Sequence, residues 1–201
     1  MDYCVLSYIP TLTALLDSRR DYRRVQKREA KALLAAVSHP YQGTRLHLVK
    51  EEARIVTQIV PDENLVILSS DSGSSAEQTA SADRICQLLP AASIFHLACH
   101  GQQVMDDPLE SGFSMSDRKL TVAQLMALDL PSAFFAFLSA CETAKGDANQ
   151  PDQAIHLAAT MLYAGFKSIV GTMWSVYDQR ADRSRADNGL PGHCSQVNER
   201  C

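Results

Sequence analysis

Two kinds of apolar pattern alternate along the chain. Short apolar segments rich in branched residues predict strands at residues 2–8, 32–37, 65–68, 93–99, 133–138 and 167–174. Apolar residues at helical spacing predict helices at residues 10–20, 49–60, 81–89, 121–128 and 152–163. The segment 113–120, with Ser116-Asp117-Arg118 in its middle, predicts a hairpin. This order favours an α/β fold with a mostly parallel sheet and helices on both faces.

The pattern stops after Asp178, and this point divides the chain. Residues 1–178 read as one domain, and residues 179–201 have few large apolar side chains and no period, which predicts an irregular or disordered tail. The 201 residues are 46% hydrophobic and 21% charged, an ordinary globular composition. The net charge of −4 argues against a nucleic-acid or membrane-surface partner as the first interpretation.

The cysteines and the amino end bear on the compartment. No Cys-x-x-Cys motif occurs, and six cysteines scattered through a chain of this size indicate reduced thiols rather than a disulfide framework. Residues 1–8 lack the basic start of a signal peptide, and no apolar run is long enough for a membrane span. We therefore expect a cytoplasmic protein without a membrane partner.

Two reactive side chains stand at the ends of predicted strands. His100 follows the strand at 93–99, and Cys141 follows the strand that begins near Ala133. Functional residues of open α/β sheets lie beyond the carboxyl ends of the strands. If these two strands are neighbours in the sheet, the imidazole and the thiol lie side by side at one edge. A cysteine nucleophile needs a base, and a histidine can take up and release a proton near neutral pH.

Each residue also has an ordinary structural interpretation, as a core cysteine and a strand-edge histidine. A zinc site formed by His96, Cys99, His100 and Cys141 is a rival chemistry. It is disfavoured because Cys99 would face away from the two histidines and the spacing matches no common zinc motif. His96 then reads as a core or supporting residue.

Further residues could complete a catalytic site. Gly101 has no Cβ, so backbone N–H groups of Gly101 and Cys141 could hold a substrate oxyanion. Glu142 and Asp178 are acidic residues near strand ends that could orient the histidine or line a pocket, although solvated loop carboxylates are the simpler interpretation.

The segments Phe95–Gly101, sequence FHLACHG, and Phe137–Thr143, sequence FLSACET, resemble the paired signature of CHAT domains. These are caspase-like cysteine peptidases, and the chain is similar in particular to those of fungal proteins. The resemblance runs from about Tyr3 to Asp178. It implies a caspase-like fold with Cys141 as nucleophile, His100 as general acid/base, and no metal or organic cofactor.

The resemblance also implies a protein or peptide substrate and, in longer relatives, a regulatory partner or a repeat domain. The family pattern continues past Asp178 with a helix that residues 180–201 do not resemble, and longer relatives have sequence before the amino end. These departures favour a domain truncated at both ends. A cysteine endopeptidase is the first hypothesis, and the alternatives are an inactive caspase-like interaction module or a truncated, non-functional fragment.

Overall fold

The computed structural model describes residues 11–20, 25–26, 28–71, 75–104, 106–141 and 157–171, with the backbone alone for Asp17 and Cys141. The described α-helices are α1 (Leu12–Arg19), α2 (Val49–Ile59), α3 (Ala82–Leu88), α4 (Val122–Met126) and α5 (Leu157–Tyr163). The described strands are β1 (Ala32–Ala36), β2 (Leu65–Ser69), β3 (Ile94–Gln102), β4 (Gly112–Ser114), β5 (Lys119–Thr121), β6 (Phe135–Cys141) and β7 (Ser168–Gly171). Short 3-10 turns lie at Asp62–Asn64, Ala76–Gln78, Leu89–Ala91 and Pro108–Glu110.

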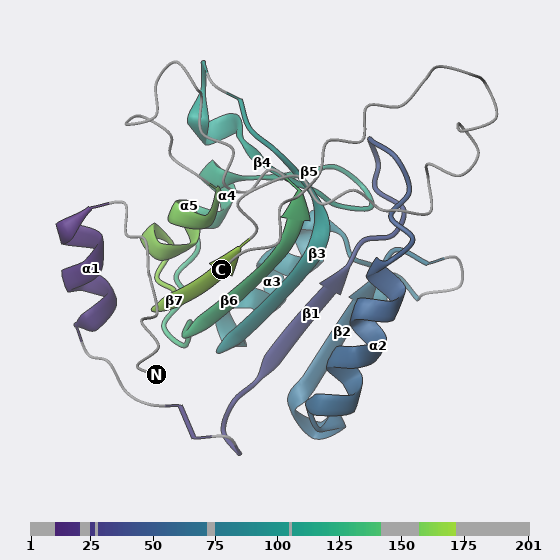
Figure 1. The fold of residues 1–201 in the computed structure, drawn as a ribbon, viewed down its shortest axis with the longest axis horizontal. Coiled ribbons are helices and arrows are strands. Elements are labelled where there is room, and N and C mark those ends of the chain that lie inside the picture. The colour runs from purple at the N-terminus through teal and green to yellow at the C-terminus, as the bar shows by residue number, and fades with distance from the viewer. Residues whose placement is uncertain are drawn as a thin grey trace, which may run out of the picture.

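The described strands form one mixed sheet with β3 at its centre (Figure 1). β1 and β6 lie parallel to β3 on its two edges, β2 pairs with β1, and β7 pairs with β6. The β4–β5 hairpin runs antiparallel and pairs with the last residues of β3. The prediction of a mostly parallel α/β sheet is confirmed.

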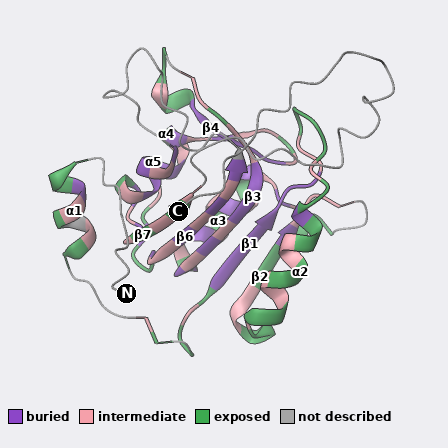
Figure 2. Cartoon of the chain, viewed as in Figure 1, coloured by how far each residue is buried: buried purple, intermediate pink, exposed green. Residues whose placement is uncertain are grey.

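One face of the sheet holds the main hydrophobic core. Side chains from β1, β3 and β6, such as Leu33, Phe95 and Leu138, pack there with residues of α3, α4 and α5. The rings of Phe95 and Phe166 stack with their centroids 6.4 Å apart, and both side chains are fully buried. Figure 2 shows this burial along the central strands. The core therefore joins the centre of the sheet to the segment between α5 and β7.

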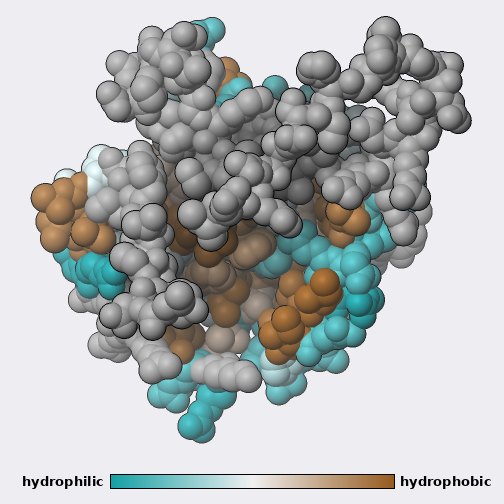
Figure 3. All heavy atoms as spheres, viewed as in Figure 1, coloured by the Kyte–Doolittle hydropathy of each residue, from teal (hydrophilic) through white to brown (hydrophobic). Residues whose placement is uncertain are grey.

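The opposite face carries α2, which lies in front of β2 and beside β1 in Figure 1. Val49 of α2 packs against Ala36 and Ala98, with Ala53 beside them. Ile55 and Ile59 of α2 stay exposed to solvent. Figure 3 shows apolar side chains gathered on the surface in the region of α2. Helices on both faces of the sheet agree with the sequence pattern.

Local signals explain where several elements begin and end. The Thr121 hydroxyl accepts from the Gln124 N–H while the Gln124 side chain accepts from the Thr121 N–H, which is a capping box at the start of α4. Gly165 follows α5 with φ of +117°, a conformation that ends helices and suits glycine. The expected hairpin is β4–β5, with Ser116, Asp117 and Arg118 at its turn.

Two strands extend further than the sequence pattern predicts. β3 continues past Cys99 to Gln102, because residues 100–102 pair with β4. β6 begins at Phe135 and includes Cys141. The predicted strand at 2–8, the first turn of the helix at 152–163 and the tail at 179–201 lie outside the described residues. The domain boundary after Asp178 therefore stays a prediction.

Candidate active site

The register of β3 and β6 places the two candidate catalytic residues side by side. His100 is the Cα partner of Cys141, at the carboxyl end of two parallel strands. His100 also pairs with Ser114 of β4 on its other edge. Both residues lie in strands rather than in loops. β4 extends the pairing of β3 beyond the end of β1 and so includes His100, and Cys141 is the last residue of β6. The predicted adjacency of the two strands is confirmed at the level of the backbone.

The His100 ring is hydrogen-bonded through one nitrogen to the main chain of another element. His100 Nε2 lies 2.7 Å from the carbonyl oxygen of Thr44. A carbonyl only accepts, so Nε2 must donate and carry the hydrogen. In the neutral ring the other nitrogen, Nδ1, then has the free lone pair and can accept a proton. The Thr44 contact selects the tautomer that a general base needs.

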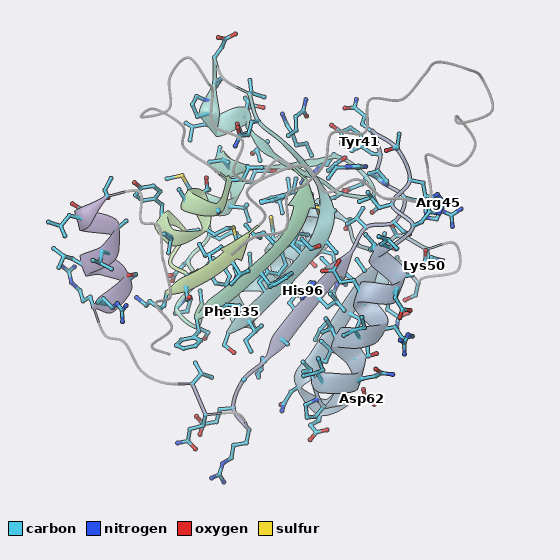
Figure 4. The ribbon with its side chains drawn as sticks, in the orientation of Figure 1. Tyr41, Arg45, Lys50, Asp62, His96 and Phe135 are labelled. Atoms are coloured by element: carbon cyan, nitrogen blue, oxygen red, sulfur yellow. The ribbon has the colours of Figure 1, made fainter. Side chains whose placement is uncertain are left out.

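Thr44 belongs to the loop of residues 38–48, which joins β1 to α2 and has several fixed contacts. Leu46 N donates to Ser38 O at 3.0 Å and closes the loop on itself. Tyr41 N donates to Met115 O at 2.9 Å, and the Ser114 hydroxyl donates to Gln42 O at 3.1 Å. Figure 4 labels Tyr41 in this loop. The loop that carries the Thr44 carbonyl, which accepts the hydrogen bond from His100 Nε2, is therefore held by the end of β4 and by the segment directly after β1.

Gly43 brings this loop close to the imidazole. Its φ is +102°, and a Cβ built on it would lie 3.1 Å from His100 Cδ2 and 3.5 Å from Nε2. Both the backbone conformation and the space favour glycine at this position. The loop thus closes over one side of the ring without displacing it.

A second polar cluster lies at the carboxyl ends of β1 and β2. The Asp71 carboxylate accepts from the Ser38 hydroxyl at 2.8 Å and lies 3.0 Å from Lys50 Nζ. Burial alone would raise the pKa of Asp71, but the Lys50 and Ser38 contacts outweigh it and hold the pKa below its ordinary value. This cluster joins the start of the 38–48 loop to the first turn of α2, where Figure 4 labels Lys50.

A partly buried carboxylate lies on the face of β3 and β6 that carries His96 and Ser139. Glu52 of α2 accepts from His96 Nε2 at 2.7 Å and from the Ser139 hydroxyl at 2.9 Å. The His96 ring stacks on Phe137, with centroids 4.8 Å apart. His96 is labelled in Figure 4, and the expectation that it is a core or supporting residue stays a prediction.

The other predicted site residues fall in different places. Gly101 lies within β3, where it pairs with Phe113. Glu142 and Asp178 lie outside the described residues. Cys99 is buried in the core on the opposite face from His96 and His100, and the described part of the chain contains no cluster of metal-ligating side chains. The surface hollow lined by Arg28, Pro61 and Glu63 is at the amino ends of β1 and β2, at the far edge of the sheet.

Comparison with protein families agrees with this geometry. The model of the CHAT domain matches residues 1–183. The chain belongs to the CHAT domain family. This CHAT domain therefore has the caspase-like α/β fold and is related to caspase-like cysteine peptidases. No curated protein matches the chain significantly.

Sequence reasoning missed the residues that contact His100 or bridge the two strands that carry the CHAT domain's candidate pair. Gly43 and Thr44 act through main-chain position, so their side chains gave little signal. Glu52 did give a signal in the sequence, because it stands beside the apolar stripe of an amphipathic helix.

Among the described helices, none has the length and apolar character that a membrane span needs.

Proposed function

We propose that this CHAT domain is a cysteine endopeptidase with Cys141 as nucleophile and His100 as general acid/base. The observation that supports it most strongly is the pairing of these two residues across β3 and β6. Adjacent parallel strands place paired residues within reach of a short proton transfer. Membership of a caspase-like family supports the same chemistry.

The hydrogen bond to Thr44 supports the role of His100. Thr44 follows β1, which pairs with β3 on the edge opposite β6. Since Nε2 donates toward that loop, Nδ1 is left on the other side of the ring as the proton acceptor. The main chain thus fixes the tautomer of the ring.

The reaction proceeds in two stages. His100 Nδ1 takes the proton of the Cys141 thiol, and the sulfur forms a bond to the substrate carbonyl carbon. Backbone N–H groups of Gly101 and Cys141 stabilise the resulting oxyanion. The C–N bond then breaks, the imidazolium gives its proton to the leaving amine, and a thioester remains. Water, losing a proton to His100, attacks the thioester, the C–S bond breaks and the thiol regains that proton.

The substrate and the compartment belong to the same proposal. A protein or peptide chain is the substrate, and Glu142 and Asp178 are the acidic residues proposed to orient the histidine or line its pocket. We propose a cytoplasmic location, where thiols such as the free thiol of Cys86 stay reduced. A regulatory partner remains a further proposal taken from the family.

A peptide-library cleavage assay tests the proposed function. We expect the wild type to cleave internal peptide bonds, and both Cys141→Ala and His100→Ala to lose more than about 99% of the rate. Cys86→Ala is the matched control, because it removes a thiol from α3 and should leave cleavage intact. Absence of cleavage by the folded wild type would reject the proposal in favour of an inactive interaction module.

A further inference from the structure

Glu52 contacts both strands that hold the candidate pair. Its Oε1 accepts from His96 of β3 at 2.7 Å, and its Oε2 accepts from Ser139 of β6 at 2.9 Å. The side chains of Glu52 and His96 are 27% and 15% exposed, so both groups are largely withdrawn from water. A single carboxylate therefore bridges α2, β3 and β6.

The bridge lies directly behind the candidate site. His96 is four residues before His100 on the same face of β3, and Ser139 is two residues before Cys141 on β6. Ala98, the partner of Ser139, lies between His96 and His100 along β3. Glu52 lies in the first turn of α2, directly after the 38–48 loop that offers the Thr44 carbonyl. The same helix is thus fixed to the sheet at one point and positions the loop at another.

Withdrawing a carboxylate from water costs free energy, so packing alone does not explain Glu52 at this position. Its neighbours Val49 and Ala53 show that apolar residues fit the interface between α2 and the sheet. An ion held between two donors specifies one relative position of three elements, whereas apolar contacts tolerate small displacements. This contrast indicates that Glu52 fixes the relative position of α2, β3 and β6.

We propose that Glu52 is a positioning residue for the His100–Cys141 pair. By bridging His96 and Ser139 it fixes α2 against β3 and β6, and through α2 it holds the 38–48 loop so that Thr44 O meets His100 Nε2. The effect on turnover rests on the proposed peptidase function. The effect on the loop does not, because it follows from the contacts alone.

Amide hydrogen exchange tests the loop directly, in the full chain and without any substrate. In Glu52→Gln the peptides covering residues 38–48 should exchange about tenfold faster relative to those covering β1. Glu51→Gln is the matched control. It removes the same charge from the preceding position of α2, where Glu51 is exposed and pairs with Arg54 of the same helix. Its loop should exchange as in the wild type.

Kinetics separate positioning from general stability. We expect Glu52→Gln to lower kcat about tenfold with KM within about twofold, since small misplacement of a base slows chemistry more than binding. Ser139→Ala should also lower kcat about tenfold, whereas Ser139→Thr, which keeps the hydroxyl, should retain most of the rate. The double variant Glu52→Gln with Ser139→Ala should lose less kcat than the product of the two single losses. Urea unfolding of each variant shows whether it remains folded.

The outcomes distinguish the two proposals. Equal loop exchange and equal kcat in Glu52→Gln and Glu51→Gln, with active wild type, would overturn the positioning role and leave the peptidase standing. A wild type that cleaves nothing would reject the peptidase, and loop exchange would then decide the role of Glu52 by itself. A uniform rise in exchange across β1 and the loop would also overturn it, because that marks a loss of overall stability.

Discussion

The candidate site depends on two residues, Gly43 and Thr44, whose main chain lies against the His100 imidazole. Gly43 approaches one side of the His100 ring, and Thr44 O accepts from its Nε2. These contacts leave His100 Nδ1 as the proton acceptor in the neutral ring. Activity should therefore respond to changes in a loop that contains no candidate nucleophile or base.

We expect Gly43→Ala to lower kcat/KM by at least about tenfold, because the new methyl group would press on the His100 ring. Gly165→Ala is the control. Its φ of +117° is also positive, but its nearest neighbours are 3.7 Å and 3.9 Å away and belong to Leu130. Both variants should lose about 1–2 kcal/mol of stability, as measured by urea unfolding. Equal activity in the two variants would contradict the role of the Gly43 contact.

The residues that sequence reasoning could find were those with distinctive side chains at strand ends. Cys141 and His100 stood out because a thiol and an imidazole each followed an apolar strand. Thr44 could not be found, since any residue offers a carbonyl and only the folded loop decides where it points. Glu52 could have been inferred, because an acid beside the apolar stripe of α2 needs a partner on the sheet.

At the scale of elements, the carboxyl ends of β1 and β2 are joined to α2 through Asp71. The pKa of this carboxyl is lowered in the native state, where contacts with Lys50 and Ser38 outweigh burial. The stability that it contributes is then fully present above the unfolded pKa of about 3.9, and it is lost as pH falls through the lower native pKa. The contribution should be small, because the Asp71 side chain is one-third exposed.

Lys50→Gln should therefore reduce the free energy of unfolding at pH 7 by less than about 1 kcal/mol. The difference from the wild type should shrink as pH falls below the unfolded pKa of about 3.9 and then through the lower native pKa, where the native carboxyl becomes protonated. Urea unfolding at pH 7 and pH 3 measures both values, and Lys50→Arg, which keeps the charge, is the control. A difference in stability that grows toward low pH would contradict stabilisation through the ionised Asp71 carboxylate.

The start of α4 gives a second prediction for an element. Thr121→Ala removes the hydroxyl that accepts from Gln124 N, so the protein should lose about 1 kcal/mol. Thr121→Ser keeps an acceptor and should lose less than half as much. Thermal unfolding compares the two variants, and an equal loss would mean that the methyl group of Thr121, rather than its cap, stabilises α4.

A strongly periodic helix was predicted well, whereas the end of a central strand was not. The amphipathic pattern of residues 49–60 predicted α2 within one residue. The pattern ended β3 at Cys99, because His100, Gly101 and Gln102 are not typical strand residues. Pairing with β4 extends the strand through them, and such a tertiary contact is not visible in the local sequence.

At the scale of the whole molecule, one core joins the central strands to α3, α4 and α5. Phe95 and Phe166 contact each other across this core, from β3 and from the turn before β7. The parts of the sheet that hold His100 and Cys141 are therefore packed into a single cooperative unit.

Phe166→Ala should lower the free energy of unfolding by about 3–5 kcal/mol, since the side chain is fully buried and its loss leaves a cavity. Leu16→Ala, at a position 59% exposed on α1, should change it by less than about 0.5 kcal/mol. Urea unfolding followed by circular dichroism provides both values. Similar losses in the two variants would contradict a core centred on the sheet.

The rate at which iodoacetamide alkylates Cys141 tests the central pairing most directly. Mass spectrometry resolves each cysteine, and Cys86, whose pKa is raised by burial, is the internal reference. At pH 7 Cys141 should react faster than Cys86, and His100→Ala should slow Cys141 at least about tenfold while leaving Cys86 unchanged. An unchanged Cys141 rate in folded His100→Ala would contradict the account, because the imidazole would then not act on the thiol.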